Sequence, residues 1–498
     1  MTLSSAYNII NSAFAVTGAQ SATIARNITN ASTPGYSREI ANVVDNPYGG
    51  ADVASITREA NSALLDQVNS STSESASQSA IAAGLATLAQ TVSDSASTTS
   101  SGAMQNGSSP SAMLANLQGA LTTYEADPSN DSVGDAAVSA AGDLTASLNS
   151  GAAAVQQVRS QADANMAASV ATINSLLNQF TQLNATVVNG LQSGADISSA
   201  EDSEDSILTQ LSQQVGISTT TNANGSVSIY TDSGVTLFQD VPQTLSFTPS
   251  PTLTAGISGN PVTVDGIPIT GASAPMAIQS GALAGLAQLR DTIAPEYQAQ
   301  LDQISGGLVN AFAETDQTGG TAPALPGLFT FPGATGVPST TQVTGLSGQI
   351  EVNPNVDPSQ GGDVDLLRDG GISDPGSATY TYNTTGSTGY TARIQQMVSA
   401  IGATQSFDPS AGLGASDSLS DYANNSVSWL QGQNQQATDA ASYQSSVVTQ
   451  ATSALSNATG VNLDTEMTNM LNIENSYTTS AKLLTTVNDM FSALMNAA

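Results

Sequence analysis

Residues 3–38 read LSSAYNIINSAFAVTGAQSATIARNITNASTPGYSR, and the spacing of their apolar side chains decides how the chain begins. Alternating steps of four and three define a heptad seam at Leu3, Tyr7, Ile10, Phe14, Thr17, Ser21, Ile24 and Ile28. This pattern predicts an amphipathic helix over residues 3–31, roughly 43 Å long at about 1.5 Å per residue. Pro34 disfavours helix in the residue before it and Gly35 permits a turn, so the helix is expected to end there.

The other end of the chain repeats this pattern. The same heptad steps connect Met470, Ile473, Tyr477, Ser480, Leu484, Val487, Phe491 and Leu494. Asn462 suits a helix cap, and Asp464 and Glu466 complement the positive end of a helix. Both termini are therefore predicted to be helices with a narrow seam, and we expect the two helices to pair.

The interior alternates between helical and extended patterns. Few prolines and three-four apolar spacing predict long helices from residue 74 to 215, broken near Gly102 to Pro110 and at Asp127-Pro128. Short β-branched runs predict strands at 217–221, 227–231, 235–238, 243–247 and 262–269, with turns at Asn224-Gly225 and around Gly234. Helical spacing returns over 283–312 and 416–454, and a Gly, Pro and Thr rich segment lies between them.

We expect a mainly α fold with β insertions, built from discontinuous domains. Residues 1–45 and 455–498 would form a terminal coiled-coil domain, and 46–215, 281–316 and 401–454 a helical bundle. Residues 216–280 would form a small outward β-domain, and 317–400 a second insertion of loops and short strands.

The composition excludes several kinds of chemistry. The 498 residues carry a net charge of −32, which repels nucleic acid and anionic membranes, so neither is an expected partner. The chain has no cysteine and no histidine, which removes disulfides, thiolate metal sites and the commonest general base. We therefore expect no enzymatic activity, no cofactor and no tightly bound metal.

The first residues show no basic leader followed by an apolar run, so no cleavable secretory signal is expected. No stretch reaches the roughly 20 apolar residues of a membrane span. If the protein is secreted, it must use a route that reads no cleaved leader.

The segment 27–38, NITNASTPGYSR, resembles the N-terminal motif of the flagellar axial family, which includes rod, hook and hook-associated proteins. Residues 460–467, 475–477, 481–484 and 490–491 resemble the C-terminal helix of the hook-associated protein 1 family. Weaker similarity covers most of the interior, including Asp127-Pro128 and residues 281–290. One departure is the acidic stretch 199–206, where the family would have a more apolar, arginine-containing sequence.

This resemblance implies a structural, extracellular flagellar subunit exported by the flagellar type III route and assembled as a ring between hook and filament. It implies four partners: other copies of the chain, the hook protein, a second junction protein (hook-associated protein 3), and an export chaperone at the C-terminal helix. The expected assembly residues are Leu3, Tyr7, Ile10, Phe14, Ile24, Ile28, Pro34, Gly35, Tyr36, Arg38, Leu463, Met470, Ile473, Tyr477, Leu484, Val487, Phe491 and Leu494.

Simpler readings remain open for these residues. The seams could be ordinary intrachain core, and residues 34–36 a plain loop. Two carboxylate groups, at 201–205 and at 357–369, could ligate calcium but lack EF-hand spacing, so turns and helix starts are the preferred interpretation. Lys482, the only lysine, is expected to be a surface charge, and Trp429 a core or interdomain residue.

Two alternative functions also stay open. A hook protein shares the N-terminal motif but would be mainly β after it. A secreted adhesin or enzyme would carry its site in residues 317–400.

Overall fold

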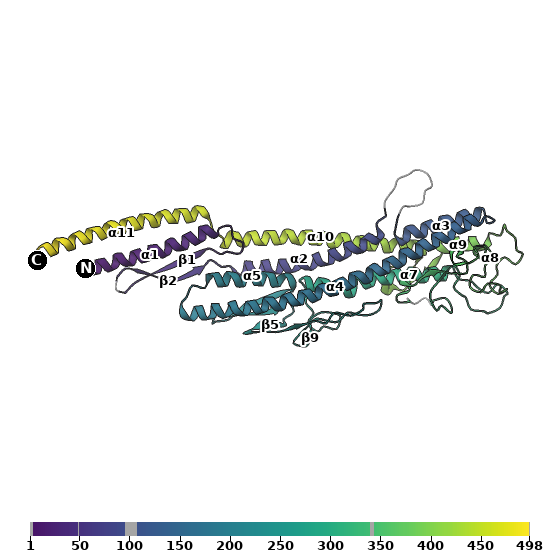
Figure 1. Ribbon diagram of the computed structural model, residues 1–498, viewed down its shortest axis with the longest axis horizontal. Helices are drawn as coiled ribbons and strands as arrows, with labels where there is room; N and C mark the ends of the chain where they lie inside the picture. Colours follow the sequence, from purple (N-terminus) through teal and green to yellow (C-terminus); the bar gives the residue numbers. More distant parts are fainter. Residues whose placement is uncertain (1–2, 48, 95–106, 339–342, 498) are drawn as a thin grey trace.

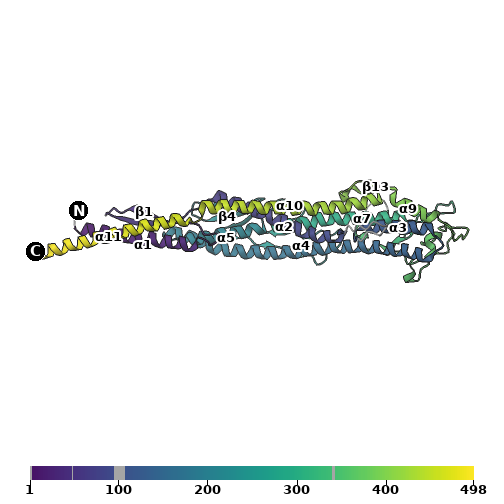
Figure 2. The same ribbon diagram turned by 90° about the horizontal axis from the view of Figure 1, so that it is seen from above.

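The computed structural model describes residues 3–47, 49–94, 107–338 and 343–497. Figure 1 shows an elongated molecule with both termini at one end, and Figure 2 shows the long helices running side by side. The fold is mostly helical, at 60%, with small antiparallel sheets, and the terminal helices pack together. The expected fold class is therefore confirmed.

The terminal part contains two helices and one hairpin. Helix α1 (Leu3–Asn30) packs antiparallel to α11 (Leu463–Ala497), and strands β1 (Glu39–Asp45) and β2 (Ala51–Arg58) form a hairpin against α1. The hairpin was not anticipated, because its alternation is interrupted by a bulge between Asn42 and Val43. At its tip, Gly50 has a φ of 106° and a Cβ there would meet Ser12 Oγ at 2.1 Å, so only glycine allows this approach.

The bundle is built around very long helices. Helix α2 (Ser62–Ala89) lies along α10 (Leu419–Thr459), and α4 (Asp131–Ser193) continues for 63 residues. The remaining helices are α3 (Pro110–Ala126), α5 (Ser198–Gln214), α6 (Ala282–Gln288), a π-turn (Leu289–Ile293) and α7 (Ala294–Ala311). The break predicted at Asp127-Pro128 is confirmed, because α3 ends at Ala126. The predicted break near Gly102 lies outside the described residues.

Two small sheets cover one side of α4. Strands β3 (Ile217–Thr221), β4 (Val227–Thr231), β5 (Thr236–Gln239) and β6 (Val241–Pro242) form a four-stranded sheet in that order. Strands β7 (Leu245–Ser246), β8 (Thr263–Val264) and β9 (Ile267–Pro268) form the second. The strand predicted over 262–269 is wrong as one element, because Asp265 and Gly266 adopt positive φ values of 47° and 80° and turn the chain back.

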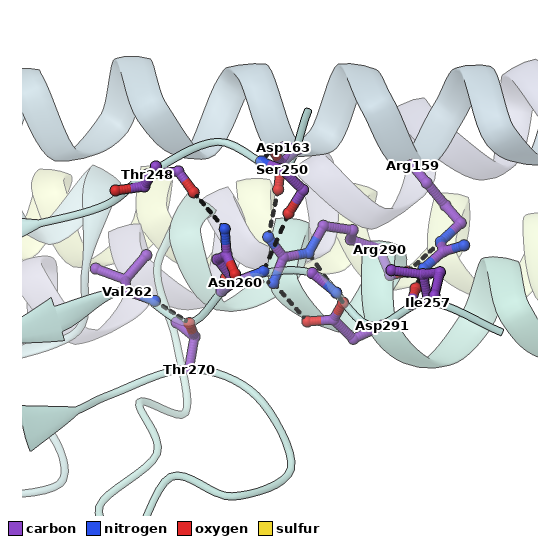
Figure 3. Close-up of polar contacts among 11 residues, drawn as sticks. Arg159, Asp163, Thr248, Ser250, Ile257, Asn260, Val262, Thr270, Arg290 and Asp291 are labelled. Carbon is purple, nitrogen blue, oxygen red and sulfur yellow. Dashed lines mark hydrogen bonds and ion pairs between the residues drawn. The ribbon is translucent and has the colours of Figure 1, made fainter. Parts of the chain in front are cut away.

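A buried ion cluster fastens the loop between β7 and β8 to the bundle (Figure 3). Arg290, which is fully buried, pairs with Asp163 on α4 and donates to the carbonyl of Asn260 at 2.9 Å. Asp163 also accepts from the backbone amide of Ser250 at 2.7 Å, and Arg159 donates to the carbonyl of Thr254 at 3.0 Å. The loop thus supplies backbone partners to buried charges.

The segment after α7 packs on the far end of the bundle. Its elements are β10 (Phe329–Thr330), β11 (Glu351–Val352), α8 (Asp365–Asp369), α9 (Ala392–Gly402), β12 (Thr404–Ser406) and β13 (Ser416–Ser418). Short 3₁₀ turns occupy Gln90–Val92, Leu346–Gly348, Pro358–Gln360 and Pro409–Ala411. Glu314, fully buried, accepts backbone hydrogen bonds from Gly371, Ile372 and Ser373, which holds this segment in place.

One continuous hydrophobic cluster includes side chains from the helices, the β-sheets and residues 317–400. Trp429 is partly buried against it, as expected. The domain boundaries drawn from the sequence stay predictions.

Candidate assembly interface

A buried asparagine joins the terminal helices at the base of their pairing. Asn27 is 1% exposed and donates to the carbonyl of Glu39 at 3.0 Å and to Glu466 Oε2 at 3.3 Å. Its Oδ1 accepts from the Tyr36 hydroxyl at 2.8 Å and from the Glu39 amide at 2.9 Å. One side chain therefore connects α1, the Pro34 loop, β1 and α11.

Glu466 is the matching residue on α11 and is fully buried. Besides Asn27, it pairs with Arg38 Nε at 2.7 Å. The backbone amide of Arg38 donates to the carbonyl of Thr459 at 2.8 Å, and its guanidinium reaches Glu59 at 3.3 Å. We call Asn27, Tyr36, Arg38, Glu39 and Glu466 the clasp, because together they hold the start of α11 against α1 and the hairpin.

A second ionic group connects the hairpin to the bundle. Arg58, at the end of β2, pairs with Glu201 at 3.0 Å, with Asp202 at 3.0 Å and with Asp205, all on α5. Asp202 also accepts from the backbone amide of Ser37 at 3.1 Å. Burial raises the pKa of Asp205, and Arg58 opposes that rise by stabilising the ionised form. Three carboxylates of the acidic segment 199–206, which differs from the family pattern, are thus paired with Arg58.

Glu204 lies on the same helix but differs from its neighbours. Its side chain is 5% exposed and accepts from Asn184 Nδ2 at 2.9 Å. Burial raises the pKa of Glu204 to about 7. The carboxyl group therefore changes charge near neutrality, although histidine is absent from the chain.

The two seams meet along the clasp-proximal half of the terminal helices. The rings of Phe14 and Tyr477 pack edge to face with centroids 5.0 Å apart, and Ser21 Oγ lies 3.7 Å from Met470 Sδ. These two contacts fix the antiparallel register. Aromatic pairs of this geometry stabilise by about 0.5–1.5 kcal/mol beyond area burial.

The seam residues differ in exposure. On α1, Ile10 and Ile24 are each 6% exposed, whereas Tyr7 is 45% exposed. The half-buried seam residues are Leu3, Phe14, Ile28, Met470, Ile473, Leu484 and Val487. The exposed ones are Leu463, Tyr477, Phe491 and Leu494, at 47%, 54%, 55% and 67%. The structure therefore brings the predicted seams together and leaves the distal end of α11 uncovered.

The Pro34 loop takes an exposed position above a groove. Pro34 and Gly35 are exposed, Gly35 with a φ of 78°, and Tyr36 turns back to Asn27. A groove of about 910 Å³ runs from this loop to α5 and the end of α10. Burial, with Glu39 close by, raises the pKa of Tyr36 above its ordinary value, so the phenol stays protonated as a donor.

Sequence reasoning did not assign a role to Asn27, Glu39 or Arg58. Seam spacing selects apolar positions, and Asn27 directly precedes the seam residue Ile28. Only the register of α1 on α11 shows that Asn27 faces Glu466. The sequence did contain one signal for this contact: Asn27 and Glu466 are polar residues beside the two seams, and both lie within the motifs that resemble the flagellar family.

The other candidates have structural roles. Asp357 accepts from the amide of Ser359 at a short turn, and Asp365 and Asp369 pair with Arg368. Within the described ranges, no group of three or more acidic side chains is arranged to hold a metal ion. Likewise, no helix in the described part of the chain is long and apolar enough to cross a membrane.

The terminal helices are thus held together at one end by the clasp and leave apolar side chains uncovered at the other. A model of the flagellar hook-associated protein FlgK helical domain matches residues 101–328, and one of the flagellar basal body rod FlgEFG protein C-terminal region matches 453–497. The chain belongs to the flagellar hook-associated protein FlgK family. This family consists of structural proteins of the flagellum, which is the class of protein expected from the sequence.

A solved structure is also similar, that of the flagellar hook junction protein FlgK from Burkholderia pseudomallei. It is 22% identical, with a TM-score of 0.41, over 53% of this chain and 46% of that one. The similarity therefore spans less than half of that protein. No curated protein sequence matches the chain.

Proposed function

We propose that the chain joins the flagellar hook to the filament, as one subunit of a ring built on its paired terminal helices. The observation that carries this proposal is the distal end of α11. There Met490, Phe491, Leu494 and Met495 are 54%, 55%, 67% and 70% exposed. Each such side chain gains about 1.5–3 kcal/mol on full burial, so neighbouring subunits supply what the single chain lacks.

The clasp gives this surface a fixed direction. Glu466, in the first turn of α11, belongs to a buried hydrogen-bond network, so the uncovered end of the helix projects from a defined base. Arg58 extends the same network to α5 in the bundle. The position of the outer bundle is thereby coupled to that of the terminal helices, as an adaptor between two different structures requires.

The partners are proposed on the same basis. Other copies of the chain contact one another laterally, the hook protein binds on one side, and hook-associated protein 3 binds on the other. Before assembly, a cytoplasmic chaperone covers the exposed face of α11 during type III export. An uncovered apolar helix face suits each of these successive partners.

The hook-protein alternative is not supported, because the chain is mostly helical and its longest helix, α4, lies within the residues that match the helical-domain model. We find no observation that favours an enzyme or adhesin site in residues 317–400.

Deleting the gene and imaging the cells tests the function. Cells without the chain should carry hooks without filaments and release flagellin into the medium, and the plasmid-borne chain should restore filaments. Electron microscopy with an antibody to the chain should label the boundary between hook and filament. Filaments of normal number on the deletion strain would overturn the proposal.

A further inference from the structure

Lys482 differs from every other basic residue of the chain. Seven of the eight basic residues are arginines, and all seven bond to groups of their own chain. Arg26, Arg38, Arg58, Arg290 and Arg368 form ion pairs, and Arg159 and Arg393 donate to buried backbone carbonyls. Lys482 is exposed and pairs with no carboxylate among the described residues. Among the described residues, it is the one basic side chain on an otherwise acidic surface that remains available to a partner.

The sequence around Lys482 offers it no local partner. Positions three and four residues away on α11 (478, 479, 485 and 486) are all threonine, so no helical ion pair forms. The facing helix α1, residues 3–30, contains no Asp or Glu. Lys482 precedes the seam residue Leu484 by two positions, about 200° around a helix, so it points away from α1.

The register places Lys482 level with the tip of the hairpin. Tyr477 packs on Phe14, and counting five residues along both antiparallel helices sets Lys482 beside Ile9. The hairpin tip packs at the same level, because the backbone amide of Ala51 donates to Ser12 Oγ at 3.2 Å. The free cation and the hairpin tip therefore share one height along the terminal domain.

The hairpin and α11 occupy different sides of α1, as Figure 1 shows. Phe14 contacts α11 and Ile9 lies against the hairpin, and five residues at about 100° each separate these faces by about 140°. Val44 and Asp52 are directly opposite each other across the hairpin strands. Both side chains are exposed, Val44 at 49%, so this face presents one carboxylate beside one apolar residue.

We propose that Lys482 of one copy forms an ion pair with Asp52 of the neighbouring copy, while Val44 of that copy contacts the exposed Leu483. This inference rests on the proposed function and names the lateral contact of the ring. Copies arranged around an axis place one side of a subunit against the other side of the next at equal height. The α11 side carries the cation and an apolar residue 53% exposed, and the hairpin side carries their complements.

The ion pair between Lys482 and Asp52 determines how neighbouring subunits align more than how tightly they bind. An exposed ion pair is worth about 0.2–1 kcal/mol, whereas opposed like charges add repulsion between subunits that each carry −32. Reversing one charge should therefore disturb assembly more than removing it.

Charge exchange tests the pairing. Lys482→Glu and Asp52→Lys should each raise flagellin in the medium by about fivefold, and the double variant K482E/D52K should return it to the wild-type level. The matched control K482E/D439K has the same net charge but places its lysine on α10, where Asp439 is exposed, and should stay defective. Normal filaments on K482E cells, or equal rescue by both double variants, would overturn the proposal.

Cross-linking tests the geometry directly, because the chain contains no cysteine. Purified flagella that carry both Lys482→Cys and Asp52→Cys should give a ladder of covalent multimers after mild oxidation, and each single variant should give none. Monomer alone from the double variant would refute this contact even if the chain is present at the junction. Absence of the wild-type chain from flagella would instead refute the proposed function.

Discussion

At the scale of single residues, the terminal domain depends on polar groups that have no access to water. Asn27 uses its amide for four hydrogen bonds, and Glu466 has no exposed surface. A buried polar group without its partner costs about 1–3 kcal/mol, so these residues specify how α1 meets α11 more sharply than the apolar seam does.

Asn27→Ala should loosen the start of α11 without unfolding the bundle. The change removes the donor to Glu466 and the acceptor from Tyr36. The free energy needed to open this region locally should therefore fall by about 2–3 kcal/mol. Amide hydrogen exchange over residues 463–476 should accelerate, while exchange in α4 stays unchanged. Asn30→Ala is the control, because Asn30 donates only to its own helix at Arg26. Equal acceleration in both variants would contradict a special role for Asn27.

Glu204 makes stability depend on pH. The raised folded pKa of about 7 means that the folded chain binds a proton between roughly pH 4.5 and 7 that the unfolded chain has released. The stabilising contribution is therefore complete below the unfolded pKa and is lost as the pH rises through 7. Glu204→Gln should raise the free energy of unfolding by about 1–3 kcal/mol at pH 8 and change it little at pH 4.

Urea titrations at both pH values measure this difference, since the glutamine oxygen can still accept from Asn184. Glu201→Gln is unsuitable as a control, because the half-buried Glu201 carboxylate pairs with Arg58. A gain at pH 4 as large as at pH 8 would contradict the titration of Glu204.

At the scale of elements, α11 has a held half and an uncovered half. Phe491→Asp with Leu494→Asp introduces charge at side chains that are already 55% and 67% exposed in the single chain. The melting transition of the bundle should therefore stay within about 1 °C, whereas cells should lose filaments and release flagellin. A clearly lowered melting temperature would show that this face packs within the monomer, and normal filaments would show that it is not an assembly surface.

The sequence predicted those helices and strands whose apolar spacing and turn residues are local signals. Strands β3 and β4 fall at the expected residues, and α1 ends within one residue of the predicted 31, because apolar spacing and turn residues are local signals. The β1–β2 hairpin was missed because a bulge interrupts its register and because Ile40 and Val44 are exposed, so the usual alternation of buried apolar and exposed polar residues is obscured. The clasp was missed because its members are up to 439 residues apart.

At the scale of the whole molecule, the exposed seam predicts where a protease will cut first. The narrow seams alone predict that a protease trims roughly the first 40 and the last 40 residues together. The clasp narrows this prediction, because residues 27–39 and 459–466 are joined by buried hydrogen bonds. Limited proteolysis of the monomer should remove α11 beyond about Tyr477 before it removes the clasp, and mass spectrometry of the fragments identifies the sites. Early cleavage between residues 459 and 466 would contradict this order.

The nested path of the chain also sets the order in which its parts can form. If the intervening chain were disordered, closing a loop of the 439 residues between Asn27 and Glu466 would cost about 5 kcal/mol of entropy, more than the clasp's hydrogen bonds readily recover. Once α2 and α10 have packed together, their ends deliver α1 and α11 to the same place, and that cost disappears. The terminal helix pair is consequently the last part of each molecule to form, so a chain whose long helices have not yet packed lacks the surface that we propose for assembly.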